Sequence, residues 1–127
     1  MPFEVFNPKG MPPPAANYSH GAVVTGGRLL LVSGQVGVAA DGTMPNDFTA
    51  QCELAWANVA SVLAAQGAGL HNIARMNAFI DSQAHTPLFR EIRDKYVPHK
   101  PASTVVVAPL MEPEWLVEID ATAVIPD

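Results

Sequence analysis

The sequence predicts an α+β fold in which a mixed β-sheet carries two helices on one face. The hydrophobic pattern alternates between strand and helix periods in the order β-β-β-α-β-α-β-β. The 127 residues suit one domain, residues 1–127, and 49% of them are hydrophobic, which is enough for a core. Two helices on one face leave the other face bare, so we expect a second copy of the chain to cover it.

The N-terminal third predicts short strands around a proline-rich loop. Phe3–Phe6 alternates weakly and fits a short strand, and residues 7–17 hold four prolines and a glycine, which exclude regular structure. Residues 21–38, GAVVTGGRLLLVSGQVGV, predict a hairpin that turns at Gly26-Gly27. The run Leu29–Val32 is continuously apolar, which indicates a strand covered on both faces.

The middle third predicts a helix followed by a strand. From Phe48 to Gln66, apolar residues recur every three or four positions, and Asn46 or Asp47 can cap the helix that this period indicates. Residues 72–81, NIARMNAFID, follow as a strand. Cys52 is the single cysteine, so an internal disulfide and a cysteine-based zinc site are excluded, and we expect a buried thiol within the helix.

The C-terminal third predicts a second helix and two closing strands. Thr86 fits the N-cap of this helix, Pro87 fits its first helical position, and Pro98 ends it. Residues 104–108 and 115–124 then fit strands. The second of these alternates polar and apolar residues, which is typical of a strand with one covered face.

Charge and composition argue against several classes of partner. The net charge is −5 and the seven lysines and arginines are scattered, so nucleic-acid binding, which depends on phosphate neutralisation, is unfavourable. The N-terminus lacks the regions of a signal peptide, and no stretch approaches the roughly 20 apolar residues of a membrane span. We therefore expect a soluble cytoplasmic protein. The four histidines show no metal-binding spacing and nucleotide-binding motifs are absent, so we expect no metal and no cofactor.

The last strand carries an unusual acidic face. Alternation places Leu116, Glu118 and Asp120 on one face and Val117 and Ile119 on the other. The pattern fits an edge or solvent-facing strand. It also fits a partly buried carboxylate at Glu118 that acts as a general base.

Ser33 and Gly34 form a second candidate at the end of a strand. In the sequence VSGQ, Gly34 permits a ligand to approach the backbone closely, and Ser33 offers a hydroxyl group. The same residues also fit an ordinary turn at a strand end. The G-x-S-x-G pattern of a nucleophile elbow is absent, so we do not expect Ser33 to be a nucleophile.

Three segments together resemble the Rid (YjgF) family, whose older name is L-PSP endoribonuclease. They are residues 17–38 with Y-S and V-S-G-Q, residues 61–80, and residues 100–125 with V-E-I-D-A. The resemblance implies a chorismate-mutase-like fold and a homotrimer with a ligand cleft at each subunit interface. It also implies hydrolysis of reactive imines or enamines to a 2-keto acid and ammonia, without a cofactor.

The resemblance extends to individual site residues. Tyr18 of N-Y-S, together with Ser33 and Gly34 of V-S-G-Q, matches the family's substrate-binding motifs, and Glu118 of V-E-I matches its catalytic carboxylate. Addition of water to a C=N bond requires such a group to position and activate the water.

One expected residue is missing from this pattern. Family members that deaminate carry P-A-R-S, and this chain carries P-A-S-T at residues 101–104. Ser103 therefore takes the place of the arginine that grips the substrate carboxylate, and we expect it to line the same cleft. Arg90 on the second helix is a candidate substitute, or else an exposed helix residue paired with Asp94.

Three functions stay open on the sequence. The first is a Rid-type hydrolase or deaminase whose substrate is not an ordinary 2-imino acid, and the retained Glu118 favours it. The second is a homotrimer that binds a small metabolite without turnover, which the missing arginine favours. The third is an endoribonuclease, which the acidic charge and the absence of a paired His/Lys set disfavour.

Overall fold

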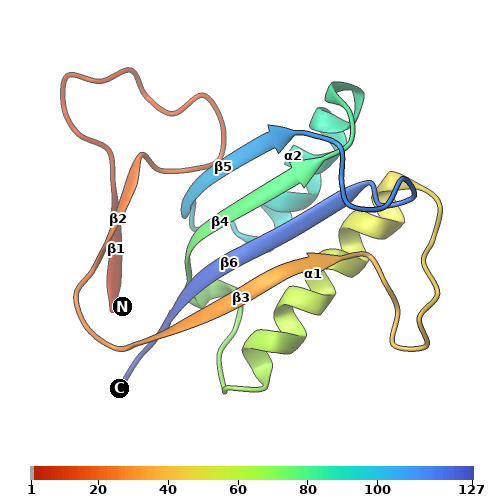
Figure 1. Ribbon diagram of the computed structural model, residues 1–127. Helices are drawn as coiled ribbons and strands as arrows, with labels where there is room; N and C mark the ends of the chain where they lie inside the picture. Colours follow the sequence, from red (N-terminus) through yellow and green to blue (C-terminus); the bar gives the residue numbers. More distant parts are fainter. Residues whose placement is uncertain (1) are drawn as a thin grey trace.

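The computed structural model describes residues 2–127 as a four-stranded sheet with two helices on one face and a two-stranded sheet beside it (Figure 1). The strands are β1 (Phe3–Phe6), β2 (Gly21–Val24), β3 (Arg28–Val36), β4 (Ile73–Ile80), β5 (Ala102–Val107) and β6 (Val117–Ile125). The helices are α1 (Phe48–Ala64) and α2 (Thr86–Tyr96), with 3₁₀ turns at Leu70–Asn72 and Gln83–His85. The predicted order of helices and strands is confirmed.

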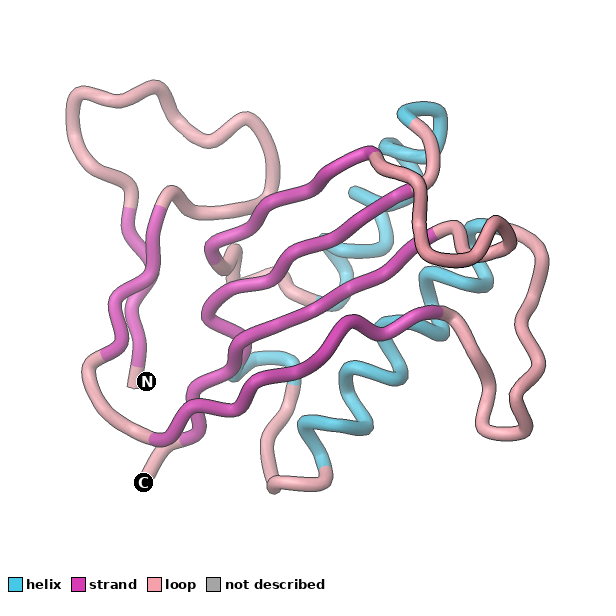
Figure 2. Tube along the Cα trace, in the orientation of Figure 1, coloured by secondary structure: helices cyan, strands magenta, loops and turns pink. Residues whose placement is uncertain are grey.

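The larger sheet is mixed, as the sequence predicted. Its strand order is β3-β6-β4-β5, and only the pair β4–β5 is parallel among the described strands. Helix α2 connects these two parallel strands, as a crossover between parallel strands requires. Both helices lie on the same side of the sheet, behind the strands in Figure 2. The opposite side, called the open face below, carries no helix of residues 2–127.

The predicted hairpin between residues 21 and 38 is wrong. Strand β2 pairs with β1, with Phe3 opposite Val24, and β3 pairs with β6 in the other sheet. The proline-rich loop returns the chain onto its own N-terminus, so Gly26-Gly27 is a crossing between two sheets. Gly27 has a φ of +81°, and a Cβ there would overlap the carbonyl oxygen of Ile125, so the crossing requires glycine.

The prediction that Leu29–Val32 is covered on both faces is also wrong for the single chain. Leu30 and Val32 are buried under the helices, whereas Leu29 and Leu31 on the open face are 62% and 74% exposed. A continuous apolar run indicates that both faces of the strand are to be buried. It does not indicate whether the same chain or another copy buries them.

The core lies between the sheet and the helices. Cys52 is fully buried there, as predicted, and burial raises the pKa of its thiol to about 12. Asp47 caps α1 by accepting a hydrogen bond from the Ala50 N–H at 3.0 Å. The prediction that Thr86 caps α2 is wrong by one residue, because α2 begins at Thr86 and His85 precedes it. No helix of residues 2–127 is long and apolar enough to cross a membrane.

Candidate functional site

A cleft of about 450 Å³ lies between helix α2 and strand β5. Three of the residues predicted to bind substrate line it: Tyr18, Arg90 and Ser103. The walls also include four apolar side chains, which are Ile80, Phe89, Val105 and Val107. The structure thus brings together three predicted residues from three separate segments of the chain.

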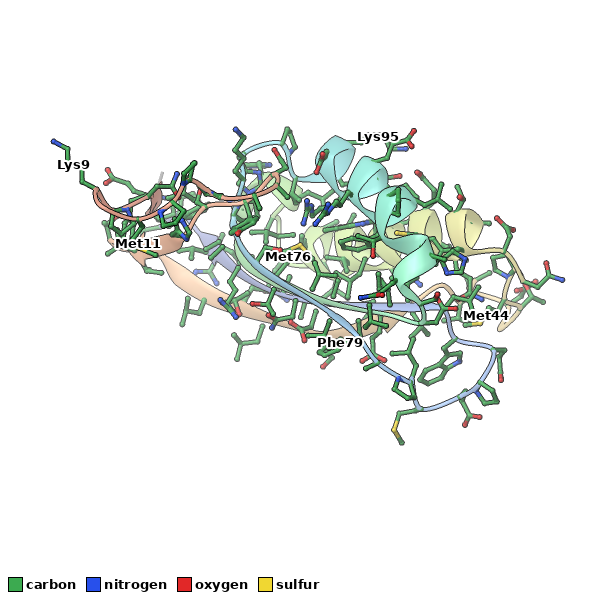
Figure 3. All side chains as sticks on the ribbon, turned by 90° about the horizontal axis from the view of Figure 1, so that it is seen from above. Lys9, Met11, Met44, Met76, Phe79 and Lys95 are labelled. Atoms are coloured by element: carbon green, nitrogen blue, oxygen red, sulfur yellow. The ribbon has the colours of Figure 1, made fainter. Side chains whose placement is uncertain are left out.

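Strand register aims Ser103 at the helices. Ser103 lies beside Met76 in the parallel pair β4–β5, and Met76 is fully buried on the helix side of the sheet (Figure 3). Ser103 therefore points into the cleft, and its Oγ is buried with no hydrogen-bond partner among the described residues. The next residue, Thr104, presents its hydroxyl to the open face, where it accepts a hydrogen bond from the Arg75 guanidinium at 3.3 Å.

Tyr18 reaches the cleft because the end of the proline-rich loop is fixed to the start of β5. The Ser19 N–H donates to the Pro101 carbonyl at 3.3 Å, and the Asn17 side-chain amide donates to the Val97 carbonyl at 3.2 Å. These two contacts bracket Tyr18. The loop's prolines limit its backbone freedom, so fewer conformations are lost when it docks.

Arg93 is a cleft residue that the sequence analysis missed. It lies on α2, lines the cleft and is only 2% exposed. Its Nε donates to the Asp94 carboxylate at 3.3 Å, its guanidinium carbon lies 5.7 Å from the centre of the Phe89 ring, and its Nη2 is buried without a partner among residues 2–127. Helical spacing from Phe89 was the available signal, because positions i and i+4 share one face.

Arg90 lies one turn earlier on α2, at the exposed side of the cleft. The alternative in which Asp94 pairs with Arg90 does not hold, because the carboxylate of Asp94 lies 3.3 Å from Arg93 instead. Within the described chain, Arg90 therefore forms no ion pair, and it lies at the exposed side of the cleft.

The remaining predicted residues gather on the open face. Val117 and Ile119 are fully buried, and Glu118 between them is half-buried on the opposite side, as alternation predicted. Glu118 pairs in register with Phe79, which Figure 3 shows on the open face. Glu118 and Phe79 line a hollow of about 190 Å³ together with residues 109–111.

Ser33 and Gly34 form an irregularity in β3 beside this carboxylate. The register between β3 and β6 shifts between Val32 and Gln35, which leaves Ser33 and Gly34 outside the regular ladder. A Cβ on Gly34 would overlap Oε2 of Glu118 and would lie 2.8 Å from its Cδ. Glycine at this position is therefore what leaves room for the Glu118 carboxylate.

Within one chain, the site residues form two separate groups. Ser33, Gly34 and Glu118 lie on the open face, and the group with Ser103 lies on the helix side of the same sheet. Glu118 is thus close to Gly34 but is separated from Ser103 by the sheet. A single copy of the chain does not combine the carboxylate with the cleft.

The described residues contain no group of three or more histidine, cysteine, aspartate or glutamate side chains placed to hold a metal ion. The polar groups of the open face instead bond to one another. Asn77 donates to the Asp120 carboxylate at 2.9 Å, and Arg75 donates to Asn77 at 3.2 Å. Asp120, the acidic neighbour of Glu118 on this face, is therefore already occupied by a hydrogen bond.

Comparison with known proteins decides the family. The family model described as Endoribonuclease L-PSP matches residues 9–125 of this chain. The chain belongs to the Rid (YjgF) family. The resemblance inferred from the sequence motifs is therefore confirmed.

Individual Rid-family proteins show how close the match is. The RutC family protein YjgH of Escherichia coli is 41% identical over 64 residues, which span about half of each protein (50% and 49%). Protein HMF1 of Saccharomyces cerevisiae is 34% identical over 102 residues, which cover 78% of each chain. The crystal structure of YyfB of Yersinia pestis, a Rid-family protein of unknown function, superposes with a TM-score of 0.86 at 32% identity, covering 98% of this chain and all of that one (100%).

Proposed function

We propose that this protein is a Rid-type hydrolase that adds water to a small imine or enamine in a cleft between subunits. The observation that carries the proposal is the environment of Glu118. Its carboxylate is half-buried on the open face and lies against the backbone of Gly34, with the exposed Ser33 hydroxyl in the adjacent bulge. A carboxylate held at a glycine is accessible to a ligand that approaches the backbone.

The chemistry needs one base and no cofactor. Glu118 takes a proton from water as the water oxygen forms a bond to the imine carbon, and the electron pair of the C=N bond moves to nitrogen. The same carboxyl group then returns this proton to the nitrogen, which gives a carbinolamine. Glu118 next moves the proton of the new hydroxyl group to the nitrogen as the oxygen forms the C=O bond and the C–N bond breaks, so ammonia leaves a carbonyl compound. General acid–base catalysis of this kind contributes about 10²- to 10⁴-fold in rate.

A homotrimer completes this proposal. The open face exposes Leu29 and Leu31 next to the strand that carries Glu118, and exposed apolar surface of this kind indicates an interface. A neighbouring copy seated there buries the two leucines. It also brings its own α2–β5 cleft to the Glu118 of the first copy, so that the two separated groups of site residues form one site.

Ser103 bears on which substrates the cleft disfavours. An arginine that grips a carboxylate with two charge-assisted hydrogen bonds contributes about 3–6 kcal/mol, at roughly 1.5–3 kcal/mol for each bond. Loss of this contact weakens binding by about 10²- to 10⁴-fold. We therefore propose that ordinary 2-imino acids, which depend on this contact, are not the preferred substrates.

A trimer that binds a small metabolite without turnover is the second candidate, and Ser103 in place of the arginine favours it. Endoribonuclease activity is a weaker alternative. The family description names it, but a net charge of −5 opposes the approach of a polyanion.

Release of ammonia from imines tests the proposal. Imines are generated in the assay by an amino-acid oxidase from a panel of amino acids, and the wild-type protein is compared with Glu118→Gln. The matched control is Glu112→Gln, which makes the same change at an exposed position outside both groups. We expect turnover by the wild type and the control, and none by Glu118→Gln. Saturable ligand binding without turnover on any imine supports the second candidate instead.

A further inference from the structure

The cleft between α2 and β5 concentrates positive charge in an acidic protein. The chain has seven lysines and arginines against twelve aspartates and glutamates. Two of the arginines, Arg90 and Arg93, line this one cleft, and no acidic residue of the described chain is among its lining residues. A cleft with this charge attracts anions, because its low-dielectric walls strengthen the field of both guanidinium groups.

Arg93 has hydrogen-bonding capacity that the protein leaves unused. Arginine is always charged and has no acceptor, so each of its N–H groups needs a partner when it is buried. Asp94 engages Nε at 3.3 Å and is itself about half exposed, whereas Nη2 is buried with no partner among residues 2–127. A buried cation with a free terminal nitrogen is costly for folding alone, and its retention indicates a ligand.

Strand β5 presents to the same cleft a second polar group without a hydrogen-bond partner in the described chain. The Ser103 Oγ is buried and has no partner among the described residues either, and it faces the helix that carries Arg93. The two groups belong to different secondary-structure elements and both are donors, so they fit one acceptor-rich group between them. A carboxylate has this character, since it accepts several hydrogen bonds and carries the opposite charge.

The cleft is larger than an acidic headgroup, and part of its lining is apolar, although Gln83, Thr86 and Thr104 also line it. The apolar part includes Ile80, Phe89, Val105 and Val107. At about 30 Å³ for each water of the liquid, the 450 Å³ cleft has room for roughly 15 water molecules. The smallest 2-imino acids have only a few heavy atoms and leave most of this apolar surface uncovered.

We propose that Arg93, together with Ser103, binds the carboxylate of an amphipathic small molecule whose apolar body packs against these four side chains. The grip on the acid thus comes from helix α2 and not from the strand position that Ser103 occupies. The identification of the cleft as the substrate site rests on the proposed function, and the binding of the carboxylate does not require turnover.

Binding of 3-phenylpropionate, measured by titration calorimetry, tests the proposal. Two probes separate its parts: 3-phenylpropanamide has the same shape without the charge, and propionate has the charge without the ring. We expect each to bind at least about 10-fold more weakly than 3-phenylpropionate to the wild-type protein. Equal affinity for the acid and its amide overturns the assignment of an anion site.

Variants assign the binding to Arg93. Arg93→Met is expected to weaken 3-phenylpropionate by about 10- to 100-fold and to remove the preference over the amide, whereas Arg93→Lys retains part of it. The matched control, Arg28→Met, changes an exposed arginine outside the cleft and leaves affinity unchanged. Wild-type affinity in Arg93→Met overturns the proposal.

Stability distinguishes a binding arginine from a structural one. Removal of a buried charge whose Nη2 lacks a partner among residues 2–127 and whose one ion pair there is with the half-exposed Asp94 should leave the melting temperature of Arg93→Met equal or higher, whereas a structural arginine causes a clear fall in every Arg93 variant, Arg93→Lys included. The two proposals also fail separately. Loss of turnover in Glu118→Gln with normal binding in Arg93→Met refutes only the carboxylate site. Loss of binding in Arg93→Met without turnover of any imine by the wild type refutes only the hydrolase.

Discussion

Replacement of Gly34 by alanine tests whether the position of Glu118 matters for function. The added Cβ would overlap Oε2 of Glu118 and lie 2.8 Å from its Cδ and 3.0 Å from its Cγ. Ordinary van der Waals contacts begin near 3.4 Å, so the carboxylate must move by about 1 Å or adopt another rotamer. Because a displacement of about 1 Å at a reacting group can cost roughly 10²-fold, we expect turnover to fall by about that factor.

The same substitution should hardly change stability. A glycine-to-alanine change within a strand stabilises the folded protein by about 0.5–1 kcal/mol, because alanine gives the unfolded chain less conformational entropy. A displaced rotamer of the half-buried Glu118 costs about 0.5–1.5 kcal/mol, so the two effects nearly cancel. The expected shift of the unfolding midpoint is therefore small and of either sign.

The assay is ammonia release alongside thermal unfolding, with Gly26→Ala as the matched control. A Cβ at Gly26 meets no atom within 4 Å, and its φ lies outside the left-handed region. The control should therefore retain both stability and turnover. Full turnover in Gly34→Ala would refute the reasoning, because the side chain that it displaces would then have no part in the reaction.

Three further outcomes follow from the structure. Leu31→Lys should give a monomer by light scattering where the wild type gives a trimer, because it charges the open face; a wild-type monomer contradicts the assembly. Turnover of the imine of alanine, whose methyl group leaves the apolar lining uncovered, should be about 10²- to 10⁴-fold below that of relatives with arginine at the position of Ser103, and parity would show that Arg93 replaces the strand arginine even for a small acid. Cys52, with a pKa raised by burial from 9.0 to about 12, should resist thiol reagents at pH 8 until the protein unfolds. Its thiol ionises only in the unfolded chain between these two values, so the free energy of unfolding should fall as pH rises above 9.0, which urea titrations can measure against Cys52→Ala.

Local patterns in the sequence were enough to predict the elements and the orientation of Glu118. Period-2 alternation in β6 placed Val117 and Ile119 in the core and Glu118 on the other face, because a strand has only two faces. The cap at Asp47 was likewise readable, since it depends on residues close in sequence.

Features that depend on tertiary pairing could not be predicted in this way. The pattern at residues 21–38 fits a hairpin, but β2 pairs with β1 because the proline-rich loop brings the two together. Arg93 was missed for a related reason. Charged residues are rarely buried, and only the tertiary packing around α2 reveals that this one is. The separation of Ser103 from Glu118 by the sheet became visible only with the register of all four strands.

Complementation between two inactive variants tests most directly the central claim that the site is shared between copies. Glu118→Gln lacks the base and Arg93→Met lacks the carboxylate contact, so neither alone should turn over substrate efficiently. When they are co-expressed in equal amounts, a trimer in which each cleft combines Glu118 of one copy with Arg93 of the next has both groups intact at about one quarter of its interfaces. The account predicts recovery of about a quarter of wild-type turnover in the mixed protein. Mixed trimers with no recovery would show that the two groups act within one chain or not at all, and would contradict the account.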